Sequence, residues 1–406
     1  VLFTSKSGLI GDWRGVGFGP ATDAGSIFST LKNLVIDRAG QSLKYGGTVG
    51  LVNAGLSFVK TGNNFVVDSV TVQNSSADGW VLREASLSLN KVTSNANGAV
   101  GMRVADSQLT LTKSKLSNNA LGGISLRDTV GLISGNQVLG NSQWGMTSED
   151  SDPELAAELV IASNKLENNS GYGLRCNLSS PPALGVNTVQ NNNNPGVLLV
   201  GATLPGSFTI VRQLGDANFD VYSASIHVKP GEVLEIEAGL QLRFAPHTGL
   251  ELDQGNPPAT LLAVGSEQEP IVLTALTGTP GGWLGLTVRT SRVNGVSWLQ
   301  HVVVDNAGEL NALGARKGIA LSSGGPLMTW VDVTVSNSLG DGLLLAESEV
   351  LVFGGSYSNN LGSGIKLDSG PSPELLDVEI VGNAGAGISG EFFHGLVRGC
   401  DISHNG

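Results

Sequence analysis

The sequence predicts an all-β protein in which short strands form rungs of about 22 residues that stack into a solenoid. Three observations lead to this fold class. A glycine returns at a nearly constant interval, the residues around each glycine repeat with it, and asparagines gather between the repeats. A period of this size is typical of architectures in which each repeat stacks on the next.

The period is clearest between residues 67 and 199. The glycines that define it lie 22 residues apart at first and then 28 and 23 residues apart: Gly79, Gly101, Gly123, Gly145, Gly173 and Gly196. An apolar residue follows each glycine, and in all but one repeat a second apolar residue follows two positions later. Such alternation predicts a strand with one buried face.

Asparagines recur shortly before these glycines. They occupy one or more positions in every repeat: Asn74, Asn95, Asn97, Asn118, Asn119, Asn141, Asn168, Asn169 and residues 191–194. Asparagine and glycine adopt left-handed backbone conformations at low cost. We therefore expect sharp bends here, and parallel pairing of neighbouring rungs about 4.8 Å apart.

This pattern resembles the right-handed parallel β-helix of the pectate-lyase-like superfamily, with its carbohydrate-binding and sugar-hydrolase type repeats. The resemblance covers nearly the whole chain, because the pattern returns around Gly342, Gly364 and Gly387. It implies a right-handed parallel β-helix for the fold. Since one scaffold hosts many activities, it implies much less about function.

The chain also contains a large duplication. Residues 1–5 match residues 271–275, and Trp13 matches Trp283 at the same offset of 270. Later matches have offsets of 268 and 263, as small changes in loop length would produce. The sequence thus predicts two homologous β-helix modules, residues 1–213 and 214–406.

Both modules are expected to be incomplete. The second copy is preceded by strands in residues 226–252 that resemble the opening rungs of bacterial surface β-helix modules, and the first copy lacks them. The second copy also stops several rungs before the first one does. We expect a fragment of a longer tandem array, with neighbouring modules at both ends covering the exposed strand edges.

Composition excludes some classes of function. The formal net charge of −12 argues against nucleic acid as a partner. No stretch approaches the ~18 apolar residues of a membrane span. The two cysteines, Cys176 and Cys400, lie several rungs apart and are expected to be unpaired thiols. An extracellular or cell-surface location is the expectation that accompanies the resemblance.

Four arginines are predicted to share one outward face, since residues at equal offsets from successive glycines stack. Arg103 and Arg175 lie two residues after a glycine, and Arg83 and Arg127 lie four residues after one. Guanidinium groups bind carboxylate or sulfate through two hydrogen bonds. The alternative is that these arginines solvate the sheet and pair with nearby acids.

Two aromatic residues belong to the same face. Trp144 and Tyr172 each precede a glycine, on consecutive rungs. Their rings are expected to lie close enough to contact one ligand, and aromatic faces stack on sugar rings. Together with the arginines they form the predicted ligand site, with a polysaccharide or a surface protein as partner.

A column of carboxylates is predicted five residues after the glycines: Glu84, Asp106, Asp128 and Asp150. Carboxylates stacked one rung apart repel each other unless cations compensate. Oxygen ligands at this spacing suit Ca²⁺. Capping of turn N–H groups and pairing with arginine is the alternative.

The single 28-residue interval places an inserted loop at residues 149–155. Glu149, Asp150 and Asp152 gather there, and they are the predicted ligands should the protein bind calcium. No other cofactor is suggested.

No catalytic set is recognisable. The resemblance implies that a lyase would use a basic residue beside acidic groups, and Arg103 or Arg127 near Asp106 and Asp128 could be interpreted in this way. The four motifs of the polygalacturonase-type hydrolases are absent, and the five histidines lack metal-binding spacing.

The favoured function is therefore a non-catalytic extracellular structural or adhesive β-solenoid with a glycan- or protein-contacting face. A calcium-assisted polysaccharide lyase, or another enzyme acting on an anionic glycan, is the alternative. Ice binding would need a flat threonine ladder, and although Thr71 and Thr93 align, Lys115 takes the next position.

Overall fold

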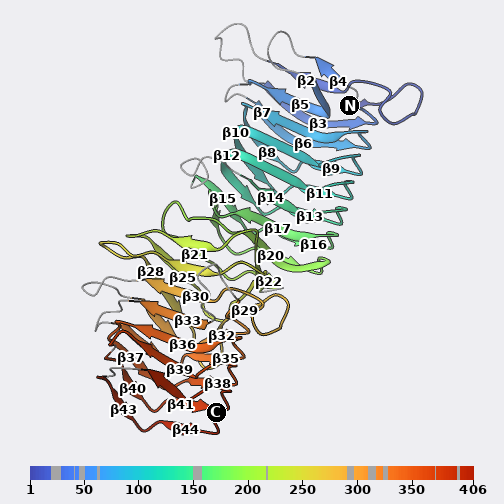
Figure 1. Ribbon diagram of the computed structural model, residues 1–406. Coiled ribbons are helices and arrows are strands. Elements are labelled where there is room, and N and C mark those ends of the chain that lie inside the picture. Colours follow the sequence, from blue (N-terminus) through green and yellow to red (C-terminus); the bar gives the residue numbers. More distant parts are fainter. Residues whose placement is uncertain are drawn as a thin grey trace. The chain divides into compact units, whose positions relative to one another are not determined.

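The computed structural model describes residues 1–19, 29–40, 42–44, 51–61, 65–149, 158–215, 218–289, 297–309, 317–322, 328–370, 372–390 and 394–406 (Figure 1). In these ranges every regular element is a β-strand. Nothing described there is a helix of the length and apolar character needed to cross a membrane. The chain divides into two compact units, unit 1 (Val1–Leu198 and Gln213–Ala217) and unit 2 (Leu199–Arg212 and Asn218–Gly406).

Unit 1 is built from three parallel ladders, so each rung has three faces. The first face contains β2 (Val16–Phe18), β5 (Leu51–Val59), β7 (Asp78–Arg83), the starts of β10 (Met102–Thr112) and β12 (Ile124–Ser134), β14 (Met146–Ser148), β17 (Tyr172–Asn177) and β20 (Asn194–Val200), in which the unit boundary falls. The second face contains the starts of β3 (Ser29–Asp37) and β6 (Phe65–Gln73), β8 (Ser86–Asn90), the ends of β10 and β12, β15 (Leu159–Ala162) and β18 (Ala183–Leu184).

The third face of unit 1 contains β1 (Leu2–Phe3), the ends of β3 and β6, β9 (Thr93–Asn95), β11 (Lys115–Ser117), β13 (Gln137–Leu139), β16 (Lys165–Glu167), β19 (Thr188–Gln190) and β22 (Leu214–Gly215). One strand departs from this parallel plan. β4 (Ser42–Lys44) pairs with β5 in the antiparallel direction.

Unit 2 repeats the plan of three parallel ladders. Its first face contains β24 (Ile226–Val228), β27 (Leu250–Leu252), β30 (Leu286–Arg289), β33 (Lys317–Ser322), β36 (Asp341–Ala346), β39 (Ile365–Asp368) and β42 (Ile388–Gly390). Its second face contains β21 (Phe208–Ile210), β25 (Val233–Ile236), β28 (Thr260–Val264), β31 (Trp298–Gln300), β34 (Met328–Val331), β37 (Val350–Phe353), β40 (Glu374–Leu376) and β43 (Leu396–Arg398). Its third face contains β23 (Asn218–Tyr222), β26 (Gln241–Phe244), β29 (Ile271–Ala275), β32 (Val302–Asp305), β35 (Thr334–Ser336), β38 (Ser356–Ser358), β41 (Glu379–Val381) and β44 (Asp401–Ser403).

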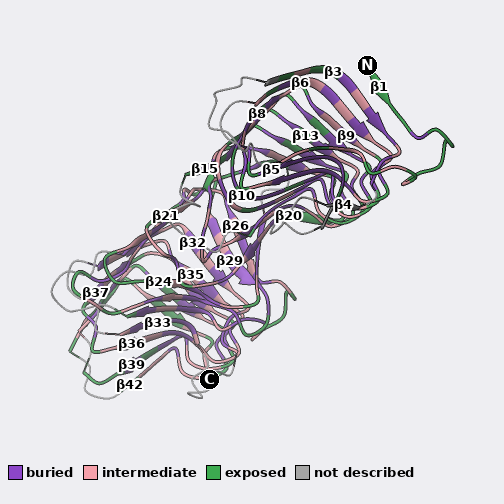
Figure 2. Cartoon of the chain, turned by 90° about the horizontal axis from the view of Figure 1, so that it is seen from above, coloured by how far each residue is buried: buried purple, intermediate pink, exposed green. Residues whose placement is uncertain are grey.

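The pairing register confirms the period expected from the glycines. Met102 pairs with Trp80 on one side and with Ile124 on the other, and Met146 pairs with Ile124 and Leu174. All five side chains are fully buried. Burying one such side chain contributes about 1.5–3 kcal/mol, so each rung is held by its contact with the next. Buried residues run along the strands of both units (Figure 2).

The asparagine corner has two functions, and the sequence pattern indicates one of them. Asn74, Asn118, Asn168 and Asn191 have φ between 52° and 56°, as expected for sharp bends. The asparagines that follow most of these bends are buried and form a ladder of amide-to-amide hydrogen bonds, 2.9–3.0 Å long, through Asn97, Asn119, Asn141, Asn169 and Asn192. Each of these amides satisfies buried polar groups of its neighbour, which apolar side chains could not do.

A second ladder stands at the corner between the second and third faces of unit 1. It runs through Asn136, Asn164, Asn187 and Gln213 with bonds of 3.0–3.1 Å. In unit 2, Asn360, Asn383 and Asn405 form a ladder of the first kind with bonds of 2.9 Å.

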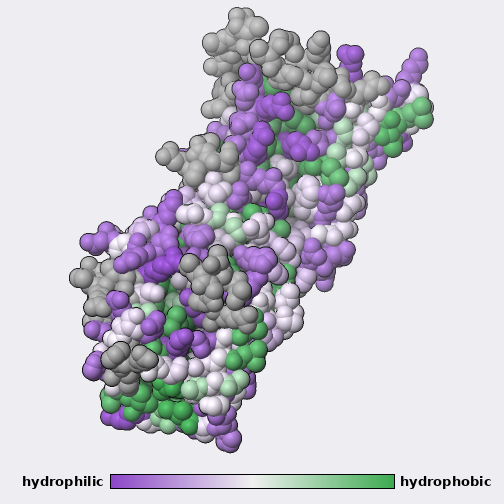
Figure 3. Space-filling model, viewed as in Figure 1, coloured by the Kyte–Doolittle hydropathy of each residue, from purple (hydrophilic) through white to green (hydrophobic). Residues whose placement is uncertain are grey.

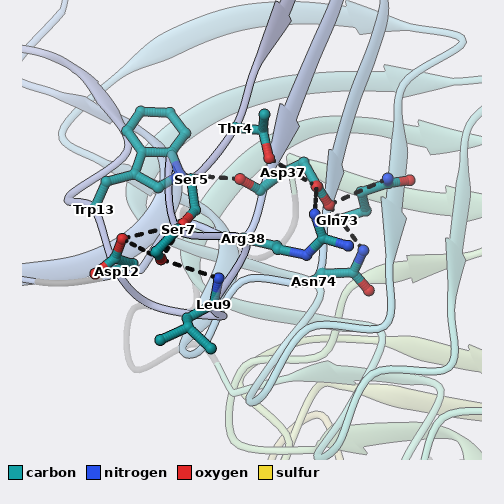
Figure 4. Close-up of polar contacts among 10 residues, drawn as sticks. All are labelled: Thr4, Ser5, Ser7, Leu9, Asp12, Trp13, Asp37, Arg38, Gln73 and Asn74. Carbon is teal, nitrogen blue, oxygen red and sulfur yellow. Dashed lines mark hydrogen bonds and ion pairs between the residues drawn. The ribbon is translucent and has the colours of Figure 1, made fainter.

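A polar network surrounds Asp37 at the end of β3 (Figure 4). Its carboxylate accepts hydrogen bonds from Asn74 Nδ2 at 2.8 Å, Thr4 Oγ1 at 3.0 Å and Gln73 Nε2 at 3.3 Å. Its backbone oxygen accepts the Trp13 indole N–H at 2.9 Å. The network joins three successive passes of the chain on the third face.

Asp305, at the end of β32, stands in a matching network in unit 2. It accepts from Asn337 Nδ2 at 2.8 Å and from Thr274 Oγ1 at 3.4 Å, and its backbone oxygen accepts the Trp283 indole N–H at 2.9 Å. These residues are the ones that the predicted duplication aligns with the Asp37 network. The duplication and its boundary at residue 213 stay a prediction.

Candidate functional site

The first face of unit 1 places the predicted arginines in two neighbouring columns. The register aligns Arg103 with Ser125, Ser125 with Thr147, and Thr147 with Arg175. Ala105 pairs with both Arg83 and Arg127 in the other column. The residues predicted to share a face therefore lie on one ladder, spread over several rungs.

Three of these arginines are already paired with carboxylates. Arg103 Nε lies 2.8 Å from Asp78 Oδ2, on the preceding rung. Arg127 lies 3.6 Å from Asp106 and 3.8 Å from Asp128. These pairs match the alternative in which the arginines neutralise local acids.

Arg175 is the third paired arginine and donates to Glu149. The fourth, Arg83, forms no ion pair with any residue that the structure describes. A row of unpaired guanidinium groups, which a polyanion would require, is therefore not formed on this ladder.

The carboxylate column forms the bends between the first and second faces. Glu84, Asp106 and Asp128 have φ of 48°, 50° and 46°, a left-handed conformation that aspartate tolerates better than most residues. Glu84 also lies 3.5 Å from Lys60. These three acids thus have a structural role and nearby cations.

One of the three predicted calcium ligands, Glu149, lies among the described residues. Asp150 and Asp152 lie outside the described residues, and the carboxylate of Glu149 pairs with Arg175. Within the described ranges no three His, Cys, Asp or Glu side chains are grouped so that they could hold a metal ion. Calcium binding at this loop stays a prediction.

Three of the predicted residues line one hollow on the surface of unit 1, here called the Trp144 pocket. Its volume is about 430 Å³, and its walls are two aromatic rings, one arginine, one leucine and small or polar residues: Ser142, Gln143, Trp144, Ser170, Gly171, Tyr172, Arg175 and Leu198. Trp144 and Tyr172 stand on consecutive rungs, where the N–H of Gly145 bonds to the carbonyl of Tyr172 at 3.0 Å. Arg83, Arg103 and Arg127 are not among its walls.

The position of Trp144 depends on a glycine that the sequence analysis did not single out. A Cβ on Gly122 would lie within 2.6 Å of three indole atoms of Trp144, Nε1 among them. The indole therefore occupies the space that any other residue at position 122 would fill. Its N–H is buried and has no hydrogen-bond acceptor among the described residues.

The stacking rule could have identified Gly122. It precedes Gly123 as Trp144 precedes Gly145, so both belong to one column. The polar walls Ser142, Gln143 and Ser170 could not be identified in this way, because asparagine-rich corners supply polar residues at every rung.

Two further hollows lie in unit 2. One of about 530 Å³ is lined by Glu349, Glu374 and His394 among others. The other, of about 480 Å³, includes His301 and Asp332, whose Nδ1 and Oδ2 atoms are 3.6 Å apart. Neither is lined by a tryptophan, tyrosine or phenylalanine. We therefore assign the candidate site to the Trp144 pocket.

Comparison with known families agrees with this architecture. A family model described as "Right handed beta helix region" matches residues 54–206, which contain the Trp144 pocket. The chain is a right-handed parallel β-helix repeat protein. No curated protein matches this β-helix chain. The narrower resemblance to the pectate-lyase-like superfamily stays a prediction.

Proposed function

We propose that this β-helix protein is a non-catalytic extracellular structural or adhesive solenoid that binds a glycan in the Trp144 pocket. The observation that carries the proposal is the pair of aromatic rings, Trp144 and Tyr172, on the walls of one shallow hollow. The apolar faces of sugar rings stack on such side chains, and hydroxyl groups at the ring edge need polar partners. Ser142, Gln143 and Ser170 supply donors and acceptors for these hydroxyl groups.

The walls of the pocket support binding rather than turnover. Glycoside hydrolases generally need two carboxyl groups that flank the scissile bond, and no carboxylate is among the lining residues. Among the described residues, Tyr172 and Arg175 are the titratable walls of the pocket. Within this described part of the chain, the walls offer no pair of a general acid and a general base.

The proposal is tested by glycan binding to the intact chain. Replacing Trp144 or Tyr172 with alanine removes a stacking surface and should weaken binding by about tenfold or more. Gly122→Ala should have a similar effect, because the new methyl group displaces the Trp144 indole although residue 122 itself does not line the pocket. Quenching of tryptophan fluorescence and retention on a glycan panel measure the affinity.

Two matched variants serve as controls. Trp298→Ala removes a tryptophan in unit 2 that is 49% exposed and lines none of the hollows described above. Gly206→Ala adds a methyl group whose nearest neighbour, Glu232 Oε2, lies 3.9 Å away in ordinary van der Waals contact. Equal losses in these controls would contradict the proposal. Cleavage of uronate polymers that needs Ca²⁺ would favour the lyase alternative instead.

A further inference from the structure

The ion pair between Glu149 and Arg175 determines what charge the Trp144 pocket presents. Arg175 is a wall of the pocket and lies in β17, two residues after Gly173. Glu149 follows β14 on the preceding rung, and Arg175 Nη1 donates to Glu149 Oε1. The only cation on the walls is thus neutralised by a carboxylate from the same chain.

This pairing has opposite consequences for neutral and acidic sugars. A neutral pyranose needs stacking surfaces and hydroxyl partners, and it leaves the ion pair intact. A uronate or a sulfated sugar would have to displace Glu149 from Arg175, or else place its own anion beside a carboxylate. Like charges in such proximity disfavour binding.

We infer that Glu149 makes the pocket selective for neutral sugars over their uronate or sulfated counterparts. The inference rests on the proposed glycan-binding function of the Trp144 pocket. Glu149 acts here as a specificity-determining residue, because its carboxylate occupies the guanidinium group that a ligand's acid group would otherwise bind.

The size of the effect follows from exposure. The side chains of Arg175 and Glu149 are 37% and 48% exposed, so water and salt screen the pair and limit its strength. Without the Glu149 carboxylate, a ligand carboxylate could accept two hydrogen bonds from the Arg175 guanidinium group. Such a ligand would then bind roughly tenfold more tightly than it binds the wild type. We therefore expect a change in preference of this order at low salt.

The test uses matched pairs of oligosaccharides in which each neutral hexose is replaced by the corresponding uronate. The wild type should prefer the neutral member of a pair. Glu149→Gln should raise the affinity for the uronate member about tenfold and change the affinity for the neutral member less than about twofold. Isothermal titration calorimetry at low and high salt measures both, and high salt should reduce the gain.

Two control variants separate this effect from a general change of charge. Glu158→Gln removes an exposed carboxylate beside β15 of the second face and should leave both affinities unchanged. The double variant Glu149→Gln/Arg175→Ala should lose the gain, because it lacks the guanidinium group. Circular dichroism verifies that each variant keeps the β-fold.

The outcomes distinguish the inference from the function on which it rests. Binding of neutral and acidic sugars with a ratio that Glu149→Gln does not change would overturn the inference alone. An equal gain in Glu158→Gln would do the same. Failure of every sugar to bind the wild type and the variants would overturn the glycan-binding function as well.

Discussion

Asp37 keeps its charge in a nearly buried position because several donors converge on it. Burial by itself would raise the pKa of this carboxyl group. The hydrogen bonds from Asn74, Thr4 and Gln73, together with the charge of Arg38, outweigh burial and hold the pKa below its ordinary value. The ionised Asp37 carboxylate is therefore more stable in the folded protein than in the unfolded chain.

This residue should make the stability of unit 1 depend on pH. Its contribution is present above the unfolded pKa of about 3.9 and is lost as the pH falls through the lower folded pKa. Asp37→Asn replaces an acceptor oxygen with an amide N–H group that faces other hydrogen-bond donors. The substitution should lower the free energy of unfolding by about 1–3 kcal/mol at neutral pH. The difference in urea midpoint between wild type and variant should shrink under acid conditions.

Glu158→Gln is the control for this measurement, because its side chain is exposed. It should change the urea midpoint little at either pH. A difference between wild type and Asp37→Asn that stays constant from neutral to acid pH would show that the carboxylate charge contributes nothing.

At the scale of elements, the asparagine ladder fastens one corner of each rung to the next. Asn141 accepts from the backbone N–H of Asn119 at 3.1 Å and from its side-chain amide at 2.9 Å. Its own N–H and Nδ2 donate to Asn169 Oδ1 at 3.0 and 2.9 Å. One side chain thus serves polar groups on both neighbouring rungs.

Asn141→Ala should be strongly destabilising for this reason. It removes the acceptor of two buried donors of Asn119, its backbone N–H and its side-chain amide, at about 1–3 kcal/mol for each such group. Asn169 Oδ1 keeps the backbone N–H of residue 141 as a donor. Asn193→Ala is the matched control, since that side chain is exposed and should change stability by less than about 0.5 kcal/mol. Urea unfolding monitored by circular dichroism compares the two, and equal midpoints would contradict a structural role for the ladder.

The elements also show what the sequence could and could not predict. The glycine period predicted the register, because Gly79 and Gly101 keep the buried residues Trp80 and Met102 in line. It could not reveal the partner of Arg103. Asp78 stands 25 residues earlier in a different column, so the ion pair depends on how side chains cross between columns.

The candidate site was predictable to a similar extent. Register alone predicted that Trp144, Tyr172 and Arg175 share a face, and in the structure these three line one pocket. Arg83, Arg103 and Arg127, predicted for the same site, do not line it. The pairing of Arg175 with Glu149 could not be predicted from the repeat, because the interval between Gly145 and Gly173 is the irregular one. Spacing says little about side chains beside an insertion.

At the scale of the whole molecule, each unit carries its own version of the same contacts. Arg103 pairs with Asp78 in unit 1, and Lys366 pairs with Asp341 at 4.0 Å in unit 2, with both residues shifted by 263 positions. In a solenoid, residues contact mainly their own and adjacent rungs. We expect damage to one copy to stay within its own unit.

The two tryptophans of the Asp37 and Asp305 networks provide the test. Trp13→Phe and Trp283→Phe each remove a hydrogen bond worth about 1 kcal/mol. Trp283→Phe should lower the free energy of unfolding by about 1–2 kcal/mol more than Trp13→Phe does. The reason is that Trp283 is fully buried and stacks on Phe244 with ring centroids 4.4 Å apart, whereas Trp13 is partly exposed.

Hydrogen exchange followed by mass spectrometry locates the effects. Exchange should accelerate near residues 271–305 in Trp283→Phe and near residues 1–40 in Trp13→Phe. Trp298→Phe, at an exposed position of β31, is the control. Acceleration spread equally over both units would argue against independent copies.

Exposed apolar side chains gather over β40 and β43, the last strands of the second face (Figure 3). Leu396 and Val397 of β43 are 46% and 36% exposed. These residues belong to the last strand of the ladder, which pairs with β40.

The asparagine ladder has a consequence for how such a protein can evolve. The bond from Asn141 to Asn169 spans 28 residues and is 2.9 Å long, the same length as the bond from Asn119 to Asn141, which spans 22. Residues added between two strands therefore leave the corner chemistry unchanged. Natural selection can lengthen the interval between two rungs, or gain and lose complete rungs by recombination, without redesigning the scaffold.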